Sequence, residues 1–133
     1  MAAHPGLLYL DTSALVKLVQ REPETEALLA ELGHWPALAT SVIGEVELRR
    51  VVRLAALAPR QAESVLARVN VVAFDDLVRE QAPGAGDPLL RTLEAIHLAT
   101  ALSLAGDLGG FACYDTRLAA EATSAGLMLV APV

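Results

Sequence analysis

The chain has 133 residues, 54% of them hydrophobic and 20% charged, which fits one globular domain over 1–133 and excludes a disordered protein. Its net charge of −6 argues against a protein that mainly coats nucleic acid. A single cysteine excludes an internal disulfide framework, no apolar run reaches the roughly 18 residues of a membrane helix, and no basic and apolar leader is evident. We therefore expect a cytoplasmic protein with no membrane partner.

Predicted strands and helices alternate along the sequence. In chain order, the patterns predict a strand over 6–10, a helix over 14–20 capped by Thr12 or Ser13, a helix from Pro23 to near Gly33, a strand over 37–40, a helix from Ser41 to about Leu57, and a helix from Pro59 to about Arg68. They continue with a strand over 70–74, a helix from Asp75 to about Ala82, a loop over 83–88, a helix from Thr92 to Ala105, a strand over 109–114, a helix opening at Asp115, and a strand over 127–131. The alternation predicts an α/β fold, with a central, mostly parallel five-stranded sheet and helices on both faces.

Two aspartates stand where predicted strands end. Asp11 and Asp115 each follow a strand and open a helix, so both are expected at the same edge of the sheet. Sites in such folds form outside the carboxyl ends of the strands. The alternative for either residue alone is a helix N-cap, a position at which Asp is favoured.

A glutamate occupies an apolar stripe of the helix over 92–105. Leu98, Ala101 and Ala105 follow Glu94 at i+4, i+7 and i+11, and no Lys or Arg lies at i+3 or i+4. A carboxylate directed at the core is costly unless something compensates its charge. Glu94 is therefore a candidate site residue; the alternative is a Glu–His pair with His97 at i+3, at the edge of the core.

The helix after Ser41 carries two acids about 200° apart around its axis, so they cannot serve one site. Glu45 has Arg49 at i+4, the spacing of an ordinary surface ion pair. Glu47 shares its side with apolar residues, which directs it inward, although Arg50 at i+3 offers an outward partner.

Four inward acids from separate segments indicate a cation site, because clustered carboxylates repel one another. Oxygen ligands without a Cys or His cluster favour a hard ion, Mg²⁺ or Mn²⁺. Such an ion can activate a water and bind a phosphodiester. Asp11, Glu94 and Asp115 are predicted as direct or water-mediated ligands, and Glu47 as the residue that holds a metal-bound or attacking water.

Four motifs together resemble the PIN-domain family, and within it the VapC toxins. They are "LDTSALVKL" at 10–18, "SVIGEVELRR" at 41–50, "LRTLEAIHLATAL" at 90–102 and "YDTRL" at 114–118, in the order and approximate spacing of the family. The resemblance implies that the family's four acids fall on Asp11, Glu47, Glu94 and Asp115. It also implies a PIN fold, a Mg²⁺- or Mn²⁺-dependent endoribonuclease that cuts tRNA or rRNA, a VapB antitoxin and a homodimer.

Two positions depart from the family pattern. Glu94 stands where Asp is usual, and Cys113 stands where Thr or Ser is frequent. A PIN-fold binding protein with weak or no activity is therefore the alternative function. A receiver domain is disfavoured because the only lysine is Lys17, and an aspartyl phosphatase is disfavoured because Ser13 stands two residues after Asp11.

Three further sets of residues have open roles. Ser13 either supports Asp11 or caps a helix, and His97 either orients Glu94 or acts as a general acid or base. Arg49, Arg50 and Arg53 form a basic patch that either meets phosphates or is simply solvated.

Overall fold

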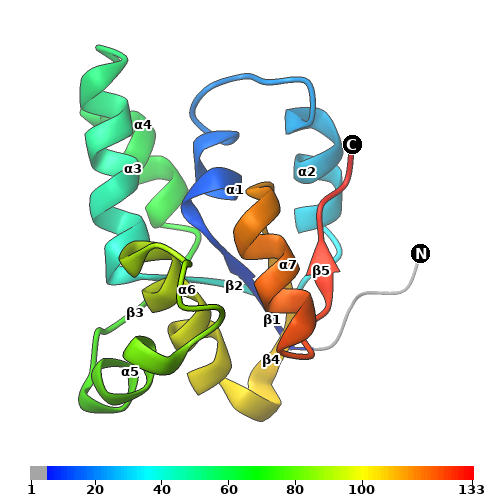
Figure 1. Ribbon diagram of the computed structural model, residues 1–133. Coiled ribbons are helices and arrows are strands. Elements are labelled where there is room, and N and C mark those ends of the chain that lie inside the picture. Colours follow the sequence, from blue (N-terminus) through cyan, green and yellow to red (C-terminus); the bar gives the residue numbers. More distant parts are fainter. Residues whose placement is uncertain (1–5) are drawn as a thin grey trace.

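The computed structural model describes residues 6–133, so the first five residues of the predicted domain lie outside the described part. Five parallel strands form one sheet in the order β3-β2-β1-β4-β5, with β1 at its centre (Figure 1). The strands are β1 (Leu7–Leu10), β2 (Ala37–Ser41), β3 (Asn70–Val72), β4 (Leu108–Ala112) and β5 (Leu129–Val130). This confirms the predicted α/β fold and its five-stranded sheet.

Helices cover both faces of the sheet, as predicted. They are α1 (Thr12–Val16), α2 (Thr25–Leu32), α3 (Val42–Leu54), α4 (Pro59–Leu66), α5 (Asp76–Gln81), α6 (Thr92–Ser103) and α7 (Thr116–Ser124), with short 3₁₀ segments at Ala82–Gly84 and Ala105–Asp107. None of the helices in the described part of the chain is long and apolar enough to span a membrane.

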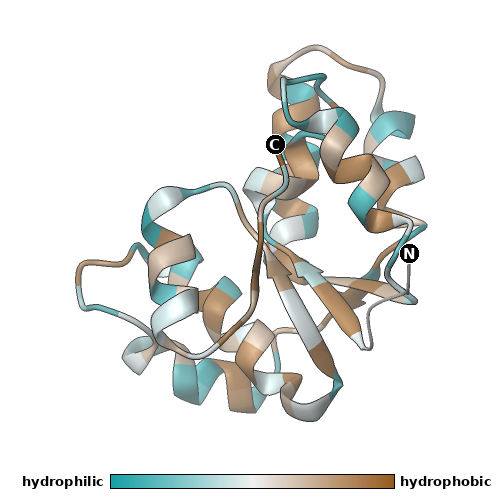
Figure 2. Ribbon diagram, turned by 90° about the vertical axis from the view of Figure 1, so that its right-hand side faces the viewer, coloured by the Kyte–Doolittle hydropathy of each residue, from teal (hydrophilic) through white to brown (hydrophobic). Residues whose placement is uncertain are grey.

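Alternation along the central strand divides the core into two layers. Leu8 and Leu10 of β1 pack with residues of α1, α2, α3 and α4, whereas Tyr9 between them packs with residues of α6 and α7. Successive strand residues point to opposite faces, so one short strand supplies both layers. In Figure 2 the strands are mainly brown or white, and hydrophilic residues lie mostly on helices and loops.

Several predicted boundaries differ from the observed ones by a few residues. The first helix begins at Thr12 rather than residue 14, because Asp11, and not Thr12 or Ser13, is its N-cap. The backbone then tightens into i→i−3 hydrogen bonds from Lys17 to Val19, which ends the α-helix before residue 20. Helix α2 begins at Thr25, two residues after Pro23.

Several elements also end earlier in the structure than the sequence predicts. Helix α3 ends at Leu54 and not near Leu57, strand β3 ends at Val72, and strand β4 ends at Ala112. Apolar residues can follow a strand without forming hydrogen bonds to a neighbouring strand. Apolar composition alone therefore overestimates the length of a strand.

A glycine permits α3 to approach the sheet and α6 closely. A Cβ on Gly44 would overlap the Thr40 hydroxyl and would lie 3.2 Å from Cε1 of His97. Thr40 is fully buried and its hydroxyl donates to the Leu10 carbonyl oxygen at 2.7 Å, so it has little freedom to move.

Gly44→Ala should therefore lower the melting midpoint, although Ala normally favours a helix interior by about 1 kcal/mol over Gly. We expect a loss of roughly 1–3 kcal/mol, the usual cost of overpacking. Gly106→Ala is the matched control, because a Cβ at that position would meet no non-adjacent residue of 6–133 within 4 Å. Thermal melts of the three proteins measure the effect, and a Gly44→Ala midpoint at or above that of the parent would contradict this account.

Candidate active site

Asp11 is a buried carboxylate at the end of the central strand, only 3% exposed. Its Oδ1 accepts hydrogen bonds from the Ala14 N–H at 3.0 Å and from the Ser13 hydroxyl at 2.6 Å. Its Oδ2 accepts one from the Cys113 thiol at 3.1 Å. These donors are all neutral. Burial therefore outweighs the hydrogen bonds and raises the pKa of Asp11 above its ordinary value.

The segment after β4 is attached to Asp11 through Ser13 and Cys113. The Ser13 hydroxyl accepts the Tyr114 N–H at 2.8 Å while it donates to Asp11, so Ser13 supports the acid and does not cap the helix. The Cys113 sulfur also lies 3.5 Å from the Asp115 carbonyl oxygen. Burial and the adjacent Asp11 charge raise the pKa of Cys113, so it stays a thiol and donates as a Ser or Thr hydroxyl would, though more weakly.

Glu94 and Asp115 lie side by side at the same edge. Asp115 caps α7 by accepting the Leu118 N–H at 2.9 Å, and Glu94 accepts the Arg91 N–H at 3.1 Å at the start of α6. Desolvation raises the pKa of Glu94, and the charge of Asp115 and a hydrogen bond with it raise this pKa further, against the opposing effect of the Arg91 N–H. Two neighbouring carboxylates repel each other when both are ionised, so a cation beside them would be favourable.

Glu47 reaches the site from α3 with its side chain 26% exposed. Its Oε1 accepts the Thr12 hydroxyl at 2.5 Å and lies 2.9 Å from Nε2 of His97. Partial burial alone would raise the pKa of Glu47, but the hydrogen bonds from His97 and Thr12 outweigh it and hold this pKa below its ordinary value. The helical periodicity correctly predicted that Glu47 points inward and that Glu45 pairs with Arg49, at 3.3 Å.

The structure gives His97 a different partner from the one predicted. His97 is buried at 3% exposure, and its two ring nitrogens face Tyr9 and Glu47, so the predicted pairing of His97 with Glu94 is wrong. Spacing of i+3 indicates which residues of one helix are neighbours, but the ring turns instead to a carboxylate on another helix. Thr12 and Tyr9 are site residues that sequence reasoning missed; the "DT" after the strand was the available signal for Thr12.

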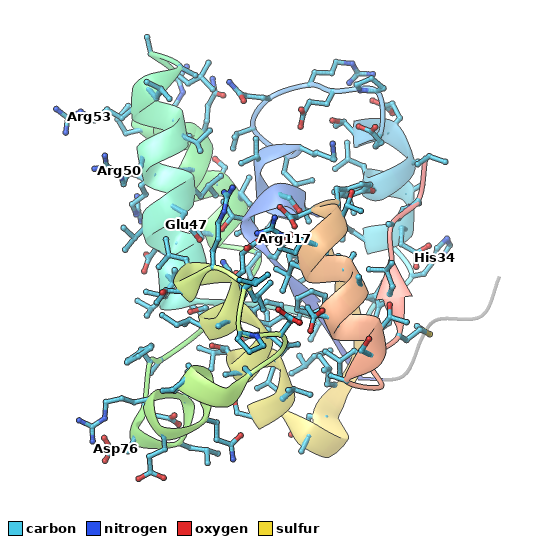
Figure 3. All side chains as sticks on the ribbon, viewed as in Figure 1. His34, Glu47, Arg50, Arg53, Asp76 and Arg117 are labelled. Atoms are coloured by element: carbon cyan, nitrogen blue, oxygen red, sulfur yellow. The ribbon has the colours of Figure 1, made fainter. Side chains whose placement is uncertain are left out.

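The arginines of α3 lie apart from Glu47. In Figure 3, Glu47 lies on the side of α3 that faces the middle of the molecule, while Arg50 and Arg53 project away from it. Arg49 and Arg53 instead line a cavity of about 370 Å³ between α3 and α4. Arg50 therefore does not draw Glu47 outward, and the basic patch is separate from the acids.

The acids could hold a cation only with help from water. Within residues 6–133, no three His, Cys, Asp or Glu side chains are already arranged as a metal-ligating group. The donor chemistry nevertheless fits Mg²⁺ or Mn²⁺. Asp11 and Asp115 each follow a strand at the same edge of the sheet, Glu94 lies beside Asp115, and Mg²⁺ usually keeps several waters beside one or two carboxylates.

A family model described as the PIN domain matches residues 8–120. The chain belongs to the PIN-domain family. Ribonuclease VapC35 of Mycobacterium tuberculosis is 41% identical over 133 residues, which covers 95% of this chain and 97% of the relative. Ribonuclease VapC46 of the same organism is 38% identical over 126 residues, covering 94% and 97%. These identities make the chain a VapC-type PIN domain, as its motifs indicated.

Solved structures share the fold at low identity. Mycobacterium tuberculosis VapC20, described as a Sarcin–Ricin loop cleaving toxin, superposes with a TM-score of 0.73 at 18% identity, over 94% of this chain and 99% of that one. VapBC2 from Rickettsia felis, bound to a DNA fragment from its promoter, gives 0.69 at 15% identity, over 96% and 99%. At these identities the likeness establishes the PIN fold alone.

Asp11→Asn should stabilise the protein in EDTA near neutral pH. The pKa of Asp11 is higher in the native protein than in the unfolded chain, so ionisation of Asp11 disfavours the native state. The free energy of unfolding should therefore fall as the pH rises from the ordinary Asp pKa through the raised native pKa. Asn keeps the shape without that charge. The gain should shrink as the pH is lowered toward the ordinary Asp range, because the carboxyl takes up its proton more readily in the native state. Melting midpoints at both pH values measure it, and an Asn variant less stable than the parent at neutral pH would refute this electrostatic account.

Proposed function

We propose that this PIN domain is a Mg²⁺- or Mn²⁺-dependent endoribonuclease and the toxin of a VapBC pair, which stops translation in the cytoplasm by cutting tRNA or rRNA. The observation that carries the proposal is the neighbouring pair of carboxylates, Glu94 and Asp115, at the sheet edge where the buried Asp11 ends the central strand. The relatives named ribonucleases and the VapC toxin structure support the reaction class. The single, buried thiol of Cys113 suits a reducing compartment.

The four acids divide into two roles in this proposal. Asp11, Glu94 and Asp115 would hold the ion directly or through water, and Glu47 would accept a proton from the attacking water or hold a water on the ion. Once bound, the ion would supply a lowered pKa for a coordinated water and positive charge for the phosphodiester. Ser13 and Cys113 keep Asp11 oriented, since both donate to its carboxylate.

The alternative, a PIN-fold binding protein with weak or no activity, has one observation in its favour. Glu94 accepts the Arg91 N–H at the start of α6, which gives a glutamate at this position a structural reason that needs no ion.

Purified protein, freed of any antitoxin, should cleave structured RNA with Mg²⁺ or Mn²⁺ and should stop when EDTA is added. Cleavage is measured by gel from end-labelled transcripts. The control is the Arg53→Gln variant, whose side chain projects away from the acids and which should keep the parent rate on short substrates. Undiminished cleavage in EDTA would exclude metal dependence.

Glu94 variants separate the enzyme from the binding protein. Glu94→Gln keeps the acceptor for the Arg91 N–H but removes the charge, so cleavage should fall by about 100-fold or more while the metal-free fold becomes more stable. Glu94→Asp should retain part of the activity, because a shorter acid is usual in the family. A Gln variant that cuts RNA at the parent rate would remove Glu94 from the site.

We also propose that the native partner is a VapB-type antitoxin that places an Arg or Lys against the four acids. Complexes named as toxin–antitoxin pairs share the fold, and this chain carries a net charge of −6. A cation from the antitoxin would supply the charge that the neutral donors of Asp11 lack. Replacing that Arg or Lys with Ala should weaken binding by roughly 2–5 kcal/mol in calorimetry. A complex that leaves all four acids open to solvent would rule this out.

The quaternary state we propose is a homodimer. Leu77, Leu89 and Leu93 are exposed at 45%, 81% and 45%, near a cavity of about 420 Å³ lined in part by Phe74 and Ile96. Exposed apolar residues in one region of a soluble domain favour association.

A further inference from the structure

His97 sits at the centre of a buried chain of hydrogen bonds that ends on Glu47. Its Nδ1 lies 2.6 Å from the Tyr9 hydroxyl, and its Nε2 lies 2.9 Å from Oε1 of Glu47. The Thr12 hydroxyl lies 3.1 Å from Nε2 and donates to the same Oε1. Tyr9 is fully buried, stacked on Phe111 with ring centroids 5.3 Å apart and meeting His97 edge to face.

The roles of the two His97 ring nitrogens depend on which of them carries the proton. The buried Tyr9 hydroxyl lies 2.6 Å from Nδ1 of His97, and a phenol ordinarily keeps its proton near neutral pH. We take the Tyr9 hydroxyl as the donor and Nδ1 of His97 as the acceptor of this short contact. A neutral ring that accepts at Nδ1 carries its proton on Nε2 and donates it to Glu47.

Glu47 is consequently held through one of its two oxygens. Both hydrogen bonds that it receives from Thr12 and His97 go to Oε1, and the side chain is still 26% exposed. Oε2 is then available to water, while Oε1 is fixed by groups that are themselves buried or tied to the core. The absent Cβ of Gly44 lets the ring of His97 lie against α3 at this point.

We propose that Tyr9 and His97 are positioning residues for Glu47, setting Oε1 through the Nε2–H tautomer of His97 so that Oε2 faces the reacting water. This inference rests on the proposed ribonuclease function and deepens it. His97 is then neither a partner of Glu94 nor a proton carrier in the reaction; it acts only through Glu47.

The activity test uses variants that keep or remove single hydrogen bonds. Tyr9→Phe removes the donor to Nδ1 and should lower kcat about 10- to 100-fold with KM for RNA little changed. His97→Gln places an amide N–H where Nε2 was, whereas His97→Asn is too short to reach Glu47. Gln should therefore retain more activity than Asn, an order that simple filling of the core would not produce.

A matched control comes from the same chain. His34→Gln changes a histidine on the α2–β2 connection, far from Glu47 in Figure 3. It should keep the parent kcat. Melting midpoints of all variants separate loss of fold from loss of positioning.

A second readout needs neither metal nor RNA. The ¹⁵N shifts of the His97 ring in metal-free protein should show a neutral ring protonated at Nε2, and Tyr9→Phe should shift it toward a mixture of tautomers, with His34 as internal reference. Asn and Gln variants that cleave equally, or a ring protonated at Nδ1, would overturn the inference. If the parent protein cuts no RNA with any divalent ion, the proposed function fails. The ¹⁵N shifts of the His97 ring then still test whether Tyr9, His97 and Glu47 form the chain of hydrogen bonds.

Discussion

The burial of the Asp11 carboxylate is the constraint on which the rest of the site depends. An acid that is 3% exposed at the end of a central strand must have its hydrogen-bonding capacity satisfied by the protein. Here a backbone N–H, a hydroxyl and a thiol satisfy it. The first opens α1, while the hydroxyl and the thiol join the start of the chain to the segment after β4. The hydrogen bonds to Asp11 therefore position the segment that carries Asp115. Asp115 in turn lies beside Glu94 in the first turn of α6.

Strand order explains why acids far apart in sequence meet. β1 lies between β2 and β4, so the segments that follow all three strands leave the sheet at neighbouring points of one edge. Asp11, Glu47 and Asp115 come from those three segments, and α6 lies against the same edge through Tyr9 and His97. These three acids need no long loop, because each lies within a few residues of a strand or on the helix that follows it.

Sequence alone predicted the elements better than the contacts between side chains. Alternating strands and helices indicated the sheet, and helical periodicity separated Glu47 from Glu45. Periodicity failed at His97, because neighbours within a helix are visible in sequence, whereas the contact with Glu47 spans 50 residues. Tyr9 was predicted only as a strand residue, since nothing in a sequence shows where a buried hydroxyl will find its acceptor.

The glutamate at position 94 illustrates how one side chain meets two demands. As the third residue of α6 it accepts the N–H of Arg91, a role for which Glu is preferred at this point of a helix. Arg91 cannot return the bond, because a guanidinium has no acceptor, so only half of the reciprocal pair forms. The other side of the carboxylate meets Asp115. An Asp at this position, one methylene shorter, would be less suited to reach back to the helix start. The longer acid thus accepts a hydrogen bond at the start of its own helix while the same carboxylate lies beside Asp115.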